Sequence, residues 1–226
     1  MSRFRMSHLL PLGLSLSVAL PTLAAQAADP CTQLQSDAEA AVEAYIETHG
    51  DLPRSYEAIL ALEDPVRKLV MSRLPAEVHY QFWQQHFAVL AEVEMSDAQK
   101  AAILAVAEIA TPEFFRRGLE EGAESVREET KKVMDLLQAV FSRDEAARIV
   151  FLPRLSQNPG AESSLFGLGG PCHCNDYWGG NECQGWPLWI CDANALCTWS
   201  YIGCGPFGLD ECNGSCCRNG STCGVT

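Results

Sequence analysis

Cysteine is distributed very unevenly along this chain of 226 residues. Ten of its eleven cysteines fall between Cys172 and Cys223, and the other one is Cys31. A segment of roughly fifty residues buries too little apolar area to fold well without added constraints such as disulfide bonds. The cysteine distribution therefore predicts two unlike parts that are joined end to end.

The first 27 residues have the pattern of a secretory signal peptide. Arg3 and Arg5 precede an apolar run over residues 9–20, and Ala25-Gln26-Ala27 is typical of a cleavage site. The run is shorter than the roughly 20 apolar residues that span a bilayer. We therefore expect residues 1–27 to be removed and the mature protein to be secreted, without a transmembrane segment. Export to an oxidising compartment favours disulfides over metal thiolates.

Charge and motifs argue against several function classes. The net charge of −13 disfavours a nucleic-acid partner, whose phosphates attract Lys and Arg. We find no Ser/His/Asp arrangement, phosphate-binding loop or GxSxG motif, so we expect a protein that is not an enzyme and uses no cofactor. His79 and His86 lie seven residues apart but lack an HExxH spacing and a third ligand. We interpret them as surface or partly buried polar residues, and we expect no metal site.

Residues 28–156 are predicted to form a helical domain. Between residues 31 and 155 apolar side chains recur at helical spacing, and the interruptions are capping and proline signals rather than strand signals. Helix starts are indicated at Asp64-Pro65, after Pro75, at Ser96 with Gln99, at Thr111-Pro112 and at Ser142 with Glu145. We expect a mainly α fold of six or seven antiparallel helices in a bundle, with Phe114 and Phe115 in the core and Arg116 and Arg117 at its rim.

Residues 157–170 are rich in Gly, Ser and Pro and are predicted to be an exposed linker. Proteases cut segments of this kind because their backbone can be drawn extended into an active site. The linker separates the helical part from residues 171–226, the disulfide-rich domain.

The even number of tail cysteines implies five internal disulfides, although the sequence does not reveal how they pair. Cys31 is then the odd cysteine, which predicts a free thiol or an intermolecular bridge. The expected disulfide residues are Cys172, Cys174, Cys183, Cys191, Cys197, Cys204, Cys212, Cys216, Cys217 and Cys223.

Large aromatic residues also gather in the tail, which holds four of the five tryptophans. So small a domain cannot bury all of them, and clustered exposed aromatics often mark a binding face. The alternative is that they pack against disulfides in a sulfur-rich core. The candidate binding residues are Tyr177, Trp178, Trp186, Trp189, Trp199, Tyr201 and Phe207.

The tail resembles a known family. The order Cys172-x-Cys174, Asp176-Tyr177, then Cys191-x₅-Cys197-x₆-Cys204, with glycines on both sides of the last cysteine, resembles the cysteine frame of fulvocin C, a disulfide-rich bacteriocin of myxobacteria. The helical region is similar to that of fulvocin C-related precursors at residues 52–56, Ile59, residues 65–67, Leu74, Trp83 and Gln99. This tail departs from the frame by extending to Cys223 and by longer loops before Cys191. Gly169-Gly170 resembles the double-glycine end of bacteriocin leader peptides, so both glycines are candidate processing residues.

The resemblance implies a secreted antibacterial precursor, without supplying a receptor or a killing mechanism. We expect residues 171–226 to act on a component of competing bacterial cells, and to be masked until a processing protease cuts the linker. Two alternatives remain open: an extracellular or cell-surface module that binds polysaccharide or protein, and a secreted disulfide-rich inhibitor.

Overall fold

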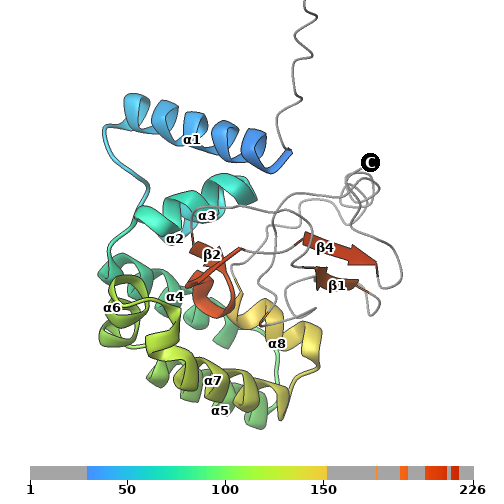
Figure 1. Cartoon of the computed structure of the whole chain (residues 1–226). Coiled ribbons are helices and arrows are strands. Elements are labelled where there is room, and N and C mark those ends of the chain that lie inside the picture. Colours follow the sequence, from blue (N-terminus) through green and yellow to red (C-terminus); the bar gives the residue numbers. More distant parts are fainter. Residues whose placement is uncertain (1–29, 152–176, 178–188, 193–201, 213–214, 219–226) are drawn as a thin grey trace, which may run out of the picture.

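A computed structural model of the chain describes residues 30–151, 177, 189–192, 202–212 and 215–218. The described chain is mainly helical, with short strands near the C-terminus and a disulfide between Cys204 and Cys212. The described residues contain eight α-helices, which are drawn in Figure 1, and they confirm the expectation of a mainly α fold. Among the described helices, none combines the length and the apolar composition that crossing a membrane requires.

The N-terminal helices begin and end at the signals in the sequence. α1 spans Pro30–His49 and ends at Gly50, which has φ +83° and donates its N–H to the Ile46 carbonyl at 2.7 Å. α3 spans Asp64–Arg73 with proline in its first turn. α4 spans Ala76–Ala91 and follows Pro75, which takes the N-cap position.

The later helices follow the capping signals equally well. α5 spans Asp97–Ile109 and α8 spans Arg143–Val150, and each starts with the expected capping box. α6 spans Pro112–Glu120, with the Thr111 side chain accepting a hydrogen bond from the Phe114 N–H. The 3₁₀ turn η1 spans Ala123–Val126 and leads into α7, Arg127–Gln138.

The sequence predicted seven helices at most because it missed α2, Tyr56–Leu60. Ser55 caps this element by accepting a hydrogen bond from the Ala58 N–H. A helix of five residues is too short to show an apolar stripe, so its periodicity cannot be detected.

The apolar core is centred on α4, which packs against α5 and α6, while α5 packs on α7 and α1 on α3. Trp83 of α4 is completely buried, and Phe114 and Phe115 of α6 are at most 2% exposed. The prediction that Phe114 and Phe115 belong to the core is therefore confirmed.

The C-terminal strands form two small antiparallel pairs. β1 (Trp189–Asp192) pairs with β4 (Ser215–Arg218), and β2 (Ile202–Cys204) pairs with β3 (Asp210–Glu211). Between β2 and β3 lies a 3₁₀ turn, η3, Pro206–Gly208. Strands of two to four residues are too short to show the alternation that would predict them.

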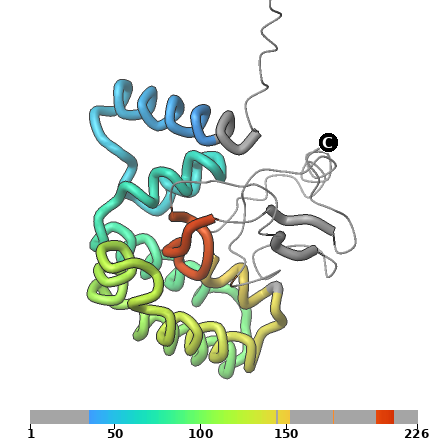
Figure 2. Tube along the Cα trace, in the orientation of Figure 1, coloured from blue at the N-terminus to red at the C-terminus, as the bar shows by residue number. Residues whose placement is uncertain are grey.

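Residues 202–212, which we call the C-terminal loop, lie among the helices (Figure 2). β2 packs against α3, and η3 packs against α3 and α8. Cys204, Phe207, Leu209 and Cys212 belong to the same apolar core as the helices. The expected linker at 157–170 lies outside the described residues. The C-terminal loop nevertheless shares its core with the helical part, although it comes from the cysteine-rich end of the chain.

Candidate functional site

Phe207 lies at the centre of the contact between the C-terminal loop and the helices. Its side chain is completely buried among four rings of α4 and α6, which we call the aromatic cluster: Trp83, Phe87, Phe114 and Phe115. Its ring centroid lies 5.1 Å from those of Trp83 and Phe114, 5.7 Å from that of Phe115 and 6.4 Å from that of Phe87. All four contacts are edge to face, an arrangement that the aromatic quadrupole favours. The cluster binds this ring in a defined orientation.

The backbone at Phe207 is strained. Its φ of +63° is in the left-handed region, which bulky residues seldom adopt and which costs about 1–2 kcal/mol for a residue with a side chain. Burial of a large apolar side chain contributes about 1.5–3 kcal/mol. The aromatic cluster therefore offsets the cost of the turn that presents Phe207.

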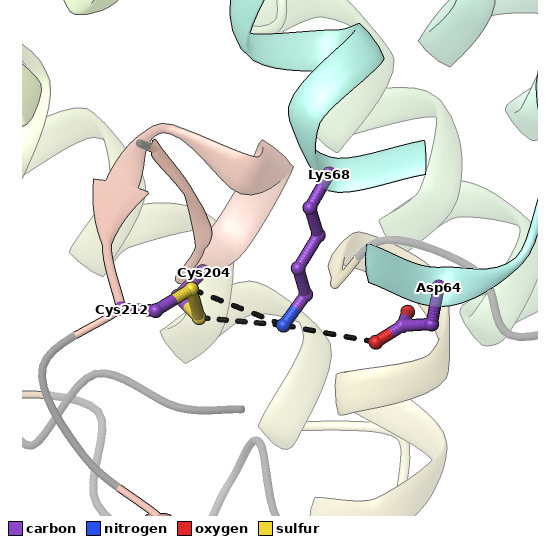
Figure 3. Close-up of a disulfide and its surroundings, with 4 residues drawn as sticks. All are labelled: Asp64, Lys68, Cys204 and Cys212. Carbon is purple, nitrogen blue, oxygen red and sulfur yellow. Dashed lines mark hydrogen bonds and ion pairs between the residues drawn. A yellow bond between two sulfur atoms is a disulfide. The ribbon is translucent and has the colours of Figure 1, made fainter. Parts of the chain in front are cut away.

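The disulfide Cys204–Cys212 closes the C-terminal loop beside a buried lysine. Both cysteines are at most 2% exposed. Figure 3 shows the Lys68 side chain extending from α3 to the disulfide, with Nζ 3.5 Å from Cys204 Sγ and 3.9 Å from Cys212 Sγ. The same ammonium lies 3.8 Å from the Asp64 carboxylate, one turn earlier on α3. Because disulfide sulfur is only a weak acceptor, this carboxylate is an essential partner for a lysine whose side chain is 6% exposed.

Two glycines allow close approach between the loop and the helices. A Cβ at Gly203, whose φ is +144°, would lie 2.8 Å from the Cβ of Lys68. A Cβ at Gly118 of α6 would lie 2.7 Å from Cδ1 of Leu209. Real Cβ atoms essentially never approach so closely. At Gly203 the loop therefore fits against α3 because the position carries no side chain, whereas a side chain at Gly118 would require the buried Leu209 side chain to shift.

Arg127, the first residue of α7, makes a polar contact at the edge of this site. Its Nη1 donates to Asp210 Oδ1 at 2.9 Å, and Asp210 is only 4% exposed. Its guanidinium carbon lies 4.2 Å from the ring centroid of Tyr177, a cation–π contact. Although burial opposes its charge, the carboxylates of Asp210 and Glu124 raise the pKa of Arg127 above its ordinary value. Arg127 thus links the helical part to two points of the tail.

His79 and His86 are both buried on α4, which differs from the expected surface or partly buried positions. His79 Nε2 donates to the Met71 carbonyl at 2.6 Å, and His86 Nδ1 is hydrogen-bonded to the Tyr56 hydroxyl at 3.0 Å. Burial lowers the pKa of His79 to about 4, against the opposing effect of the Met71 hydrogen bond. Both rings are therefore neutral members of the core at ordinary pH.

Burial also lowers the pKa of His86 to about 4. The backbone of Arg148 and Ile149 acts against this shift, but burial has the larger effect. His86 lies in T-shaped contact with Trp83, at 5.4 Å between centroids, and so it supports the aromatic cluster.

The residues predicted for a target-binding face differ in how exposed their side chains are and in whether the structure describes them. Tyr177 is 57% exposed, as expected for a binding aromatic. Phe207 is not exposed at all, because the aromatic cluster encloses it, so it cannot contact a target in the intact protein. Trp178, Trp186, Trp199 and Tyr201 lie outside the described residues, as does the side chain of Trp189.

The structure describes only some of the cysteines that were predicted to form disulfides. Cys204 and Cys212 are bonded to each other. Cys191 lies opposite Cys216, and Cys217 opposite Ile190, in the β1–β4 ladder. The other tail cysteines, Gly169, Gly170 and the side chain of Cys31 lie outside what the structure describes.

Sequence reasoning missed Lys68, Arg127 and the aromatic cluster as partners of the tail. The only local signal was the spacing of four between Asp64 and Lys68, which is common in exposed helices as well.

Within the described residues, no three His, Cys, Asp or Glu side chains lie close enough to hold a metal ion. No protein-family model, curated protein or solved structure matches the chain.

Proposed function

We propose that this chain is a secreted precursor of a bacteriocin-like peptide. In this proposal residues 1–27 direct export, and residues 28–156 form a helical bundle that carries and restrains residues 171–226. The disulfide-rich part then acts on a component of competing bacterial cells after a protease has cut the linker. The chain acts by binding and carries out no enzymatic reaction. The observation that carries the proposal is the burial of the C-terminal loop within the helical core.

The contacts of the loop support a restrained state. Phe207 is completely buried, and the Cys204–Cys212 disulfide is covered by α3 and Lys68. A segment enclosed in this way cannot contact a target while the protein is intact. A helical part that masks part of the tail is what a precursor of a toxic peptide requires.

The test measures processing and killing together. Mass spectrometry of the exported protein should detect a fragment that begins near residue 171. That fragment should kill related bacteria in its oxidised form, and the reduced fragment and the uncut protein should not. Because the tail has one basic residue, Arg218, against five acidic ones, killing should depend little on salt. Inactivity of all three forms on a broad panel of bacteria would refute the proposal.

A second candidate is an extracellular module that binds polysaccharide or protein without releasing its tail. The shared core favours it, because a disulfide-rich part that completes a helical core is suited to remain attached. In that case the uncut protein should bind a wall polysaccharide tightly, and no fragment should be found in the culture medium.

A further inference from the structure

We infer that the surface formed by α3, α4, α6 and Arg127 is a specific binding site for the C-terminal loop. This site holds the disulfide-rich part on the helical part without a covalent connection once the linker has been cut. Cutting is therefore not sufficient for release. The inference rests on the proposed function only in taking the linker as the processing site, and it is independent of what the tail acts on.

The apolar centre of this contact has the features of a binding hot spot. Phe207 and Leu209 are 0% and 2% exposed, and Phe207 inserts among the four aromatic side chains of the cluster. Large side chains in fully desolvated pockets provide most of the affinity at interfaces between proteins. The disulfide and the adjoining strand pair fix the loop around Phe207, which lowers the entropy lost on binding.

The polar edge of the contact is complementary in charge. On the helical side, Arg127 presents a guanidinium to Asp210 at 2.9 Å, and these side chains are 16% and 5% exposed. Partly buried, hydrogen-bonded charge pairs oppose dissociation more than exposed pairs do. The pair also fixes how β3 lies against α7, so the loop is bound in one orientation.

On the helical side of the contact, Leu209 packs against a position of α6 that carries no side chain, Gly118. Glycine is unfavourable within a helix relative to alanine or leucine. At Gly118 any larger residue would meet Leu209, since a Cβ would lie 2.7 Å from Cδ1 of that side chain. A glycine at this position of α6 therefore disfavours the helix but leaves room for the Leu209 side chain of the docked loop.

The experiment uses the full chain with a site for a sequence-specific protease placed in residues 157–170. This protein is folded and oxidised first, and the protease is added afterwards. A denaturing non-reducing gel should then show two fragments, whereas size-exclusion chromatography should show one species at about 1 µM. Separation of the wild-type fragments at about 10 µM would overturn the inference. A single band on the non-reducing gel would also overturn it, because the attachment would be covalent.

Variants then test the interface itself. Gly118→Leu should leave the helical circular dichroism intact but raise the dissociation constant of the cut protein by about 100-fold or more, since displacing a hot-spot contact has effects of this size. Ala101→Leu, which adds the same side chain at an exposed position of α5, is the matched control and should not change the dissociation constant. Equal dissociation constants for these two variants would contradict the proposed site.

A size exchange distinguishes contact from general damage. Leu209→Ala removes the side chain that a larger residue at 118 would meet. The double variant Gly118→Leu with Leu209→Ala should therefore bind more tightly than Gly118→Leu alone, by about tenfold. If Gly118→Leu does not fold, Leu209→Ala by itself should still weaken association by about 30-fold or more, as expected for losing a buried leucine. No weakening in Leu209→Ala would refute the inference.

Discussion

Acidification should destabilise this protein well above the pH at which carboxylates titrate, because two histidines are buried and neutral in the core. His79 and His86 have pKa values lowered to about 4 by burial. In the unfolded chain a histidine titrates near about 6.5. A group whose folded pKa is lowered contributes stability that is fully present above the unfolded pKa. That stability is lost as the pH falls toward the folded pKa, so the window runs from about 6.5 down to about 4.

The magnitude follows from the two pKa values. A pH of about 5 lies roughly 1.5 units below the pKa of a histidine in the unfolded chain but above its pKa in the folded protein. Protonation therefore stabilises the unfolded state relative to the folded state by about 2 kcal/mol per histidine. Both histidines together should therefore lower the free energy of unfolding by about 4 kcal/mol between pH about 7.5 and about 5. Glu113 and Glu129 also have lowered pKa values, caused mainly by hydrogen bonds from Arg116 and Arg117. Their contributions are lost only as the pH falls below about 4.5, and so they lie outside the measured interval.

The assay is urea denaturation of the oxidised protein, followed by far-ultraviolet circular dichroism at constant ionic strength and several pH values. His79→Gln and His86→Gln should each be less stable than wild type at neutral pH, because each disturbs a buried contact. Each should also show about half of the wild-type loss between pH about 7.5 and about 5, near 2 kcal/mol.

The double variant should show almost no loss in this interval. A wild-type loss below about 1 kcal/mol, or equal losses in wild type and the double variant, would refute the assignment of neutral buried histidines.

Three further predictions follow from the described contacts. Phe207→Ala should lower the free energy of unfolding of the intact chain by about 3–5 kcal/mol, as for other buried aromatics. Tyr177→Ala in the same tail should lower it by less than about 1 kcal/mol. Similar losses for the two variants in urea denaturation would mean that the loop is not docked. Ser142→Ala removes a capping box and should cost about 1 kcal/mol in the same assay, an effect that an unformed α8 would not show. Alkylation of the exported protein under non-reducing conditions should modify Cys31 at most, and Cys31→Ser should abolish any covalent dimer; ten modified tail cysteines would contradict five bridges.

The helical fold could be predicted from the sequence because its signals are local. The capping boxes at Ser96 and Ser142 and the prolines near positions 65, 75 and 112 mark where helices begin, and each of these starts is confirmed. A cap depends only on residues within one turn, so it can be read without knowing what packs against the helix. α2 was missed because five residues are too few for a periodic pattern.

The contact between the two parts could not be predicted because it depends on residues far apart in the sequence. Composition assigned Phe207 to the cysteine-rich tail, and a binding face was a reasonable expectation for an aromatic residue in so small a domain. The spacing of four between Asp64 and Lys68 gives no sign that Lys68 reaches Cys204. The ion pair between Arg117 and Glu129 likewise joins α6 to α7, and no short-range pattern in the sequence indicates it.

The docking of the C-terminal loop makes residues 202–212 a requirement for completing the core. Lys68 and Cys204, which meet in the core, are 136 residues apart in the sequence. Closing so large a loop costs more entropy than forming local contacts and is typical of slow folding steps. A chain still being synthesised would have most of its helical sequence in place while the rings around Trp83 lacked Phe207. Such an intermediate exposes apolar surface, which favours aggregation or capture by a chaperone until residues 202–212 have been added.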